Sequence, residues 1–396
     1  MIRTFILICI AIIGFTSCSK YNGIPKEYHQ QLDKALSQAG DNASELMKAL
    51  DAAPAHQKEA VAFLIAYMPN TDLESLSANF ILENTDYAFM AREQFSWAQS
   101  LPDSVFFNDV LPYASLNERR DNWRKDFFER FSKYVKDCNT IYEAVDSINK
   151  NIRDELLVDY NTDREKPDQS PYESIEQSMA SCSGLSILLT DAFRAVGIPS
   201  RIGGTPNWHD KRGNHNWNEV WIDGDWYFTE YYPSGLNKSW FLPDAGKAIP
   251  KNPEHAIYAS SWKTTGLHFP LVWDLNNTDV PALNVSERYI KIYKQAEEAK
   301  QIAESHVLVK VMMFKDDVCS FQGNDRVAVN VDVFCGTDQV GGGKTAGPTQ
   351  DMNDVLEFML EKNKTYNFNY TGESGQIKSI KLDIKDQPQT LKLFYK

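Results

Sequence analysis

The middle of the chain constrains the fold most, because a helical pattern is followed there by the pattern of a β-hairpin. Apolar residues recur at helical spacing from Ser183 to Val196, and Gly197 with the following Ile-Pro ends such a helix sharply. Apolar and polar residues alternate from His215 to Ile222, an Asp223-Gly224 turn follows, and Trp226 to Thr229 predicts the return strand. We therefore expect a helix packed on an antiparallel sheet.

Three residue types in this stretch point to covalent catalysis. Cys182 directly precedes the apolar helical run, where the unpaired N–H groups of a first turn stabilise a thiolate and can hold an oxyanion. His215 opens the first strand of the hairpin and Glu230 follows the second, so the turn brings the two side chains together. A cysteine nucleophile, a histidine base and a carboxylate that orients the base make a triad for acyl transfer.

Other residues compete for two of these roles. Glu219 and Asp225 are alternative carboxylates, but both lie nearer the hairpin turn than Glu230 does. His209, in a polar loop, is an alternative to His215. A metal ion bound by the cysteine and these two histidines is a further alternative, although the spacing fits no standard zinc pattern, and we expect no metal site.

Three further residues are candidates for contact with a substrate. Gln177 precedes the cysteine and is a candidate second donor to the oxyanion, with Ser181 or a backbone group as the alternative. Trp208 and Trp217 are candidates for the wall of a substrate groove, since aromatic side chains line many ligand sites.

The same stretch resembles the transglutaminase-like superfamily of papain-like cysteine enzymes. Four motifs in order carry the resemblance: Cys182 before its helix, Gly197-Ile198-Pro199-Ser200-Arg201, His215-Asn216-Trp217-Asn218-Glu219-Val220, and Trp226 followed four residues later by Glu230. The resemblance covers residues 141–240. The family usually has aspartate as its third member, and Glu230 departs from that pattern while keeping the charge and both acceptor oxygens.

The resemblance implies an acyl transfer in which the Cys182 thiolate attacks a carboxamide carbonyl and His215 protonates the leaving amine. We expect hydrolysis of an amide bond in a peptide or protein substrate, without a cofactor. Transfer to an amine, as in a protein-glutamine transglutaminase, is the first alternative. The second alternative is a peptide- or glycan-binding surface protein with an inactive triad.

The N-terminus has the pattern of an export signal. Arg3 supplies a positive charge, and an apolar run from Phe5 to Phe15 is too short to span a bilayer comfortably. The small residues before Cys18 resemble the lipobox of bacterial lipoproteins. This resemblance implies removal of residues 1–17, a lipid anchor on Cys18 and a place in the bacterial cell envelope, outside the cytoplasm. An ordinary secretory signal is the alternative.

The regions on either side of the central stretch differ in their periodicity. Residues 18–140 show helical spacing, and Thr140 is a candidate N-cap for the first helix of a central domain over 141–285. A helix followed by short alternating strands predicts a linker and a small β-sandwich over 286–396. The expected fold class is α+β, with a helical N-terminal region, a papain-like core whose cysteine helix packs on an antiparallel sheet, and a C-terminal β-sandwich.

Two segments give weaker expectations. The aromatic and Pro-rich segment 231–279 predicts irregular structure, with room for short helices, packed on the central domain. The glycine-rich run from Val340 to Gly347 predicts a loop and lacks the pattern of a phosphate-binding cradle.

Charge and cysteine content exclude some functions. The net charge of −13, without a dense basic run, argues against binding to nucleic acid. The six cysteines include no CxxC pair, which argues against a structural zinc site. Cys319 and Cys335 lie in strand-like segments and are candidates for a disulfide.

Overall fold

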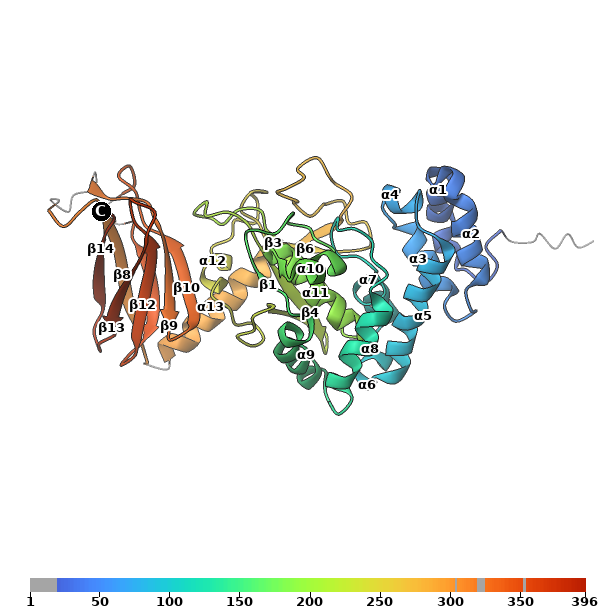
Figure 1. Ribbon diagram of the computed structural model, residues 1–396, viewed down its shortest axis with the longest axis horizontal. Coiled ribbons are helices and arrows are strands. Elements are labelled where there is room, and N and C mark those ends of the chain that lie inside the picture. Colours follow the sequence, from blue (N-terminus) through green and yellow to red (C-terminus); the bar gives the residue numbers. More distant parts are fainter. Residues whose placement is uncertain (1–19, 303–304, 319–324, 352–353) are drawn as a thin grey trace, which may run out of the picture.

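The computed structural model describes residues 20–302, 305–318, 325–351 and 354–396. A helical region, a central sheet and a β-sandwich follow one another along the long axis of the molecule (Figure 1). The mixed α and β architecture with antiparallel sheets confirms the predicted fold class. The exact domain boundaries stay predictions.

The N-terminal region is helical, as its spacing predicts. Its helices are η1 (Lys26–Tyr28), α1 (His29–Gln38), η2 (Gly40–Asn42), α2 (Ala43–Ala52), α3 (Lys58–Ala66), α4 (Asn70–Leu73), α5 (Ala78–Gln94), α6 (Ser96–Gln99), α7 (Asp103–Asp109) and α8 (Arg124–Val135). Their apolar side chains form one core together with those of the central helix that begins at Cys182. The helical region therefore supports the face of that helix which points away from the sheet.

Helix α9 (Ile141–Leu156) begins as predicted. The Thr140 side chain accepts the Glu143 N–H at 3.2 Å, and the Glu143 side chain reaches back to the Thr140 N–H. This reciprocal capping satisfies two of the N–H groups that a helix start leaves unpaired. A short parallel pair follows, formed by β1 (Asp159–Tyr160) and β2 (Met179–Ala180), with α10 (Pro171–Gln177) between them.

The central sheet is antiparallel and has the strand order β5-β4-β3-β6-β7. Its strands are β3 (Ser200–Thr205), β4 (His215–Ile222), β5 (Asp225–Thr229), β6 (Tyr258–Ser260) and β7 (Ala282–Asn284). Helix α11 (Cys182–Ala195) packs on β4 and β3. The segment 231–279 contains the short helix α12 (Leu242–Ala245), which agrees with the prediction, but it also supplies strand β6, which the prediction missed.

The C-terminal region is a sandwich of two sheets, ordered β10-β9-β12-β13 and β11-β8-β14, which enclose an apolar core. Helix α13 (Ser286–Ile302) leads into it from the central part (Figure 1). Its strands are β8 (His306–Phe314), β9 (Asn330–Cys335), β10 (Asp338–Lys344), β11 (Leu356–Glu361), β12 (Thr365–Thr371), β13 (Ile377–Asp383) and β14 (Gln389–Phe394).

Most of the glycine-rich run is a strand, so the prediction of a loop there is wrong in part. Its residues up to Lys344 belong to β10 and pair with β9. The glycines allow close packing between the sheets, since a Cβ added at Gly343 would lie 2.3 Å from a Leu356 methyl group.

Within the described part of the chain, every helix is too short or too polar to cross a membrane. Cys18 and Cys319 lie outside the described residues, so the lipid anchor and the disulfide to Cys335 stay predictions.

Candidate active site

Cys182 is the first residue of helix α11. The Ser181 side chain caps the helix by accepting the Gly184 N–H at 3.0 Å, and its hydroxyl donates to the Pro167 carbonyl at 2.5 Å. The thiol therefore lies at the positive end of the helix dipole, beside N–H groups of the first turn. These are the features that lower a thiol pKa and can stabilise an oxyanion.

His215 and Glu230 meet beside this helix start. His215 opens β4, Glu230 directly follows β5, and the two strands are paired with Asn218 opposite Thr229. Nε2 of His215 lies 2.9 Å from Oε1 of Glu230, and the two side chains are 15% and 14% exposed. Nδ1 of the imidazole is thus the nitrogen left to face the thiol.

The backbone at Glu230 is held from outside the sheet. Asn149 of α9 donates its side-chain amide to the Glu230 carbonyl at 2.9 Å. The other end of the same amide accepts the Thr229 hydroxyl at 3.1 Å. Helix α9 therefore holds the backbone from which the Glu230 side chain extends.

The thiol and the imidazole shift each other's pKa in the direction of an ion pair. Burial raises the pKa of Cys182, but the hydrogen bond and charge of His215, the Asn216 N–H and the Ser183 hydroxyl outweigh burial, and the pKa is lowered. Burial lowers the pKa of His215, but hydrogen bonds with Cys182 and Glu230 raise it to about 9. At neutral pH this arrangement favours a thiolate beside an imidazolium.

A glycine pair in β3 makes room for this arrangement. Gly204 lies opposite Asn216, whose side-chain amide donates to the Ser183 hydroxyl at 2.7 Å. A Cβ added at Gly204 would lie 2.1 Å from the Asn216 Oδ1. The glycine therefore leaves room for the Asn216 side chain, which links β4 to the first turn of α11.

Trp208 and Trp217 do not form the wall of a groove, which corrects the prediction for both. Their side chains are 4% and 1% exposed and stack on one another with ring centroids 6.0 Å apart. They belong to an aromatic core that borders His215. The centroid of the His215 ring lies 6.2 Å from that of Trp208 and 5.8 Å from that of Trp217. The two buried rings therefore pack next to the imidazole and do not face solvent.

Neither alternative carboxylate lies with the imidazole. Glu219 is fully buried and is bound by Arg201 at 2.8 Å, by Tyr289 at 2.6 Å and by Arg288. Asp225 is exposed at the hairpin turn. Glu219 therefore takes part in a buried ion-pair cluster on the far side of the aromatic core.

Gln177 ends α10, and its Oε1 accepts the Glu165 N–H at 3.2 Å. That contact turns the carbonyl end of the amide toward the connection between β1 and α10. A role as oxyanion donor stays a prediction for Gln177.

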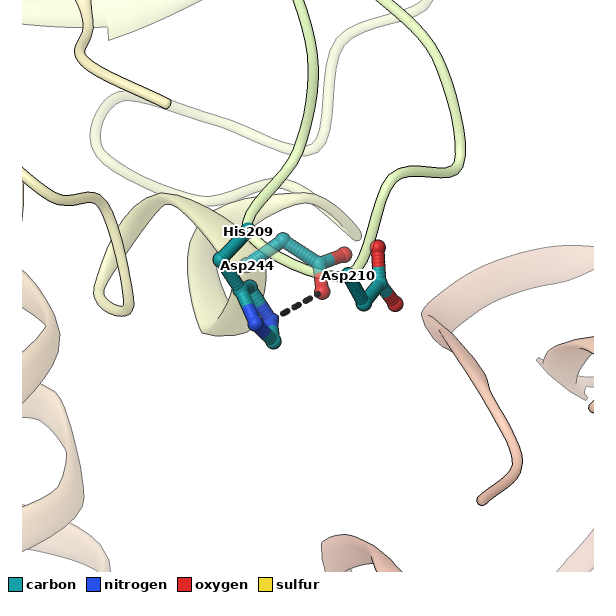
Figure 2. A group of neighbouring side chains, drawn as sticks. All are labelled: His209, Asp210 and Asp244. Carbon is teal, nitrogen blue, oxygen red and sulfur yellow. Dashed lines mark ion pairs between the residues drawn. The ribbon is translucent and has the colours of Figure 1, made fainter. Parts of the chain in front are cut away.

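His209 belongs to a different group of side chains. It lies with Asp210 and Asp244, as Figure 2 shows, and their possible ligand atoms are within 4.8 Å of one another. Arg212 binds a carboxylate oxygen of both aspartates, so the guanidinium already compensates their charge. Lysines 247 and 344 line the adjacent pocket and disfavour a cation there. Among the described residues this is the one group with metal-ligand geometry, and it excludes Cys182 and His215.

Two residues join the site that local patterns do not reveal. The Ser239 hydroxyl donates to Oε2 of Glu230. The half-buried Trp240 ring lies 5.1 Å from the His215 ring. Both precede α12 in a segment without clear periodicity. The one sequence signal for them is that an aromatic residue, Trp240, follows Glu230 closely in the chain.

Known proteins resemble this chain in its central part. The family model of the Transglutaminase-like superfamily matches residues 129–231. A solved structure from Cytophaga hutchinsonii, described as a candidate cysteine protease, is 18% identical over 36% of this chain and 48% of its own, with a TM-score of 0.28. Red sea bream transglutaminase is 8% identical over 66% of this chain and 58% of its own, with a TM-score of 0.28. The chain thus spans less than two thirds of either protein. A search of curated proteins found no match.

Proposed function

Because residues 129–231 form a transglutaminase-like domain, we propose that this chain is a cysteine enzyme that cleaves amide bonds through Cys182, His215 and Glu230. The observation that carries the proposal is the contact of His215 with Glu230 at 2.9 Å beside a thiol whose pKa is lowered. A cysteine without a catalytic role needs neither a charged base nor a helix start.

The acylation step uses the ion pair directly. The Cys182 thiolate attacks the carbonyl carbon of the amide, and the negative charge moves to the carbonyl oxygen beside the N–H groups of the first turn of α11. As the C–N bond breaks, the His215 imidazolium gives its Nδ1 proton to the leaving amine. The product is a thioester on Cys182 and a neutral imidazole.

The second step returns the enzyme to its starting state. Neutral His215 takes a proton from water, the hydroxide oxygen bonds to the thioester carbon, and the C–S bond breaks. The acid leaves, and the thiolate and imidazolium are restored. A primary amine in place of water gives a new amide. We propose water as the acceptor, because transfer requires a second binding site that excludes water and orients the amine.

We also propose that the substrate is a peptide or protein in the bacterial cell envelope, where a lipid on Cys18 would hold the chain. The basis is the sequence at residues 1–18, and a fatty-acid label recovered on the N-terminal peptide tests it. A Cys18→Ala variant that keeps the label would contradict this part of the proposal.

The test of the reaction compares the wild type with Cys182→Ala on a mixed peptide library, with and without a fluorescent primary amine. New peptide termini that depend on Cys182 support hydrolysis, and covalent incorporation of the amine supports transfer instead. Cys138→Ala is the matched control, since Cys138 lies in a half-buried position after α8. Cleavage that persists in Cys182→Ala would rule out the proposed nucleophile.

A further inference from the structure

We propose that Ser239 is a positioning residue, which holds the Glu230 carboxylate against His215 and so maintains the Cys182 thiolate. This inference rests on the proposed function. The Ser239 hydroxyl donates to Oε2 of Glu230, while Nε2 of His215 contacts Oε1. Each oxygen of the Glu230 carboxylate therefore has a hydrogen-bond partner.

A glutamate in this position needs such a second contact. Asn149 fixes the Glu230 backbone carbonyl at 2.9 Å but leaves the side chain free to rotate. Glutamate has one more rotatable bond than aspartate, and each rotamer-rich side chain loses entropy when it is held in one geometry. A hydroxyl hydrogen bond to a charged carboxylate is stronger than one between neutral groups, so Ser239 can select the productive rotamer.

The loop that carries Ser239 is closed without the serine hydroxyl. Asn237 donates its backbone N–H to the Phe228 carbonyl at 2.9 Å, and its side chain accepts the Phe228 N–H at 3.0 Å. Ser239 lies two residues beyond Asn237, so these contacts hold the loop near Ser239 whether or not the hydroxyl is present.

The next residue supports the same arrangement from another side. Trp240 lies 5.1 Å from the His215 ring at an angle of 53° and is half-buried. Two consecutive residues therefore contact two different members of the triad. Because the ring covers the imidazole, less water competes for its contact with Glu230.

The test measures the rate at which iodoacetamide alkylates Cys182 as a function of pH, which needs no knowledge of the substrate. In Ser239→Ala, we expect the acid limb of this profile to move to higher pH and the rate near pH 6 to fall about tenfold, as for the loss of one charge-assisted hydrogen bond. Ser239→Thr keeps the hydroxyl and should restore the profile. Ser234→Ala changes an exposed serine of the same loop and should have no effect.

A double-mutant cycle separates positioning from a general effect on the loop. In a Glu230→Ala background, Ser239→Ala should change the profile no further, because its partner is gone. Circular dichroism and the thermal midpoint show that each variant is folded. A folded Ser239→Ala with the wild-type profile, or a Ser239→Thr that fails to restore it, overturns the positioning role alone. A wild type whose Cys182 reacts like a free thiol overturns the proposed function and this role together.

Discussion

Nε2 of His215 lies 2.9 Å from Oε1 of Glu230, and this contact determines which nitrogen faces the thiol. Both side chains are mostly buried, so solvent screens their interaction only in part. The carboxylate favours the charged imidazole, and the charged imidazole in turn favours the thiolate. The chemistry at Cys182 therefore depends on a residue that does not touch the sulfur.

Selective labelling of Cys182 is the first prediction. At pH 6, iodoacetamide should modify Cys182 at least about tenfold faster than Cys138, because burial raises the pKa of Cys138 whereas the pKa of Cys182 is lowered. Peptide mapping by mass spectrometry after short exposures measures both rates in one sample. Equal rates would show that the thiol at the helix start is not activated.

A bell-shaped pH dependence of kcat/KM is the second prediction. The acid limb reports protonation of the Cys182 thiolate, and the basic limb should lie near pH 9, where His215 loses its proton and can no longer protonate the leaving amine. The two limbs belong to the coupled pair. A profile that stays flat beyond pH 10 would contradict a role for imidazolium.

The same pKa predicts how stability changes with pH. A histidine whose pKa is raised in the folded state from 6.5 to about 9 adds stability that is complete below pH 6.5 and is lost as the pH rises through 9. Urea unfolding of the wild type should therefore show a larger fall in free energy between pH 6.5 and 9 than unfolding of His215→Asn. Parallel curves for the two proteins would count against the raised pKa.

Loss of charge at Glu230 is a further prediction. Glu230→Gln keeps an acceptor for His215 but removes the charge, so the pKa of His215 should fall and the basic limb should move to lower pH. Turnover should drop by at least about tenfold, since an uncharged partner also allows the wrong tautomer. Steady-state kinetics across the pH range measures both effects. Unchanged kinetics would assign the orienting role to another group.

Glu219 provides a contrast in the same strand pair. Glu219→Ala leaves Arg201, which is 5% exposed, without its carboxylate partner, and Arg288 loses the same partner. Removing one partner of such a buried pair costs about 3–5 kcal/mol of unfolding free energy. Urea unfolding should show this loss, while Cys182 in the folded fraction keeps its alkylation profile. A shifted profile with unchanged stability would reverse the two roles assigned here.

Trp208 and Trp240 should also differ in whether their loss affects mainly the stability of the fold or the pKa of His215. Trp208→Ala removes a buried ring and should cost about 3–5 kcal/mol of stability. Trp240→Ala removes a half-buried ring and should affect the unfolding free energy less and the His215 pKa more. Denaturation curves and the pH profile of alkylation, measured on both variants, distinguish a core residue from one that covers the site.

Local patterns were sufficient for the elements that carry the site. The expected helix over Ser183 to Val196 matches α11, and the expected strand over His215 to Ile222 matches β4. The Thr140 cap was also predicted correctly. Helix periodicity, turn residues and caps depend on residues close together in the chain. They can therefore be predicted from the sequence without knowledge of any tertiary contact.

The predictions that failed concern residues whose position depends on contacts between segments far apart in the chain. Trp208 and Trp217 belong to the core because Phe241 and Tyr289 pack against them from later in the chain. The glycine-rich run became strand β10 because β9 offers it a hydrogen-bonding partner. Neither packing partner nor strand partner is encoded in a local pattern, which is why both predictions were wrong.

The sequence by itself determined the order of a cysteine, a histidine and a carboxylate along a helix and a hairpin, and the superfamily they resemble. Only the tertiary structure decided which carboxylate meets the histidine. Glu219 has the same chemistry as Glu230, but strand pairing places it opposite Arg201, while Asn149 and Ser239 hold Glu230 beside His215. The role of an ionisable group follows from its neighbours in space, and those are set by packing across the whole central domain.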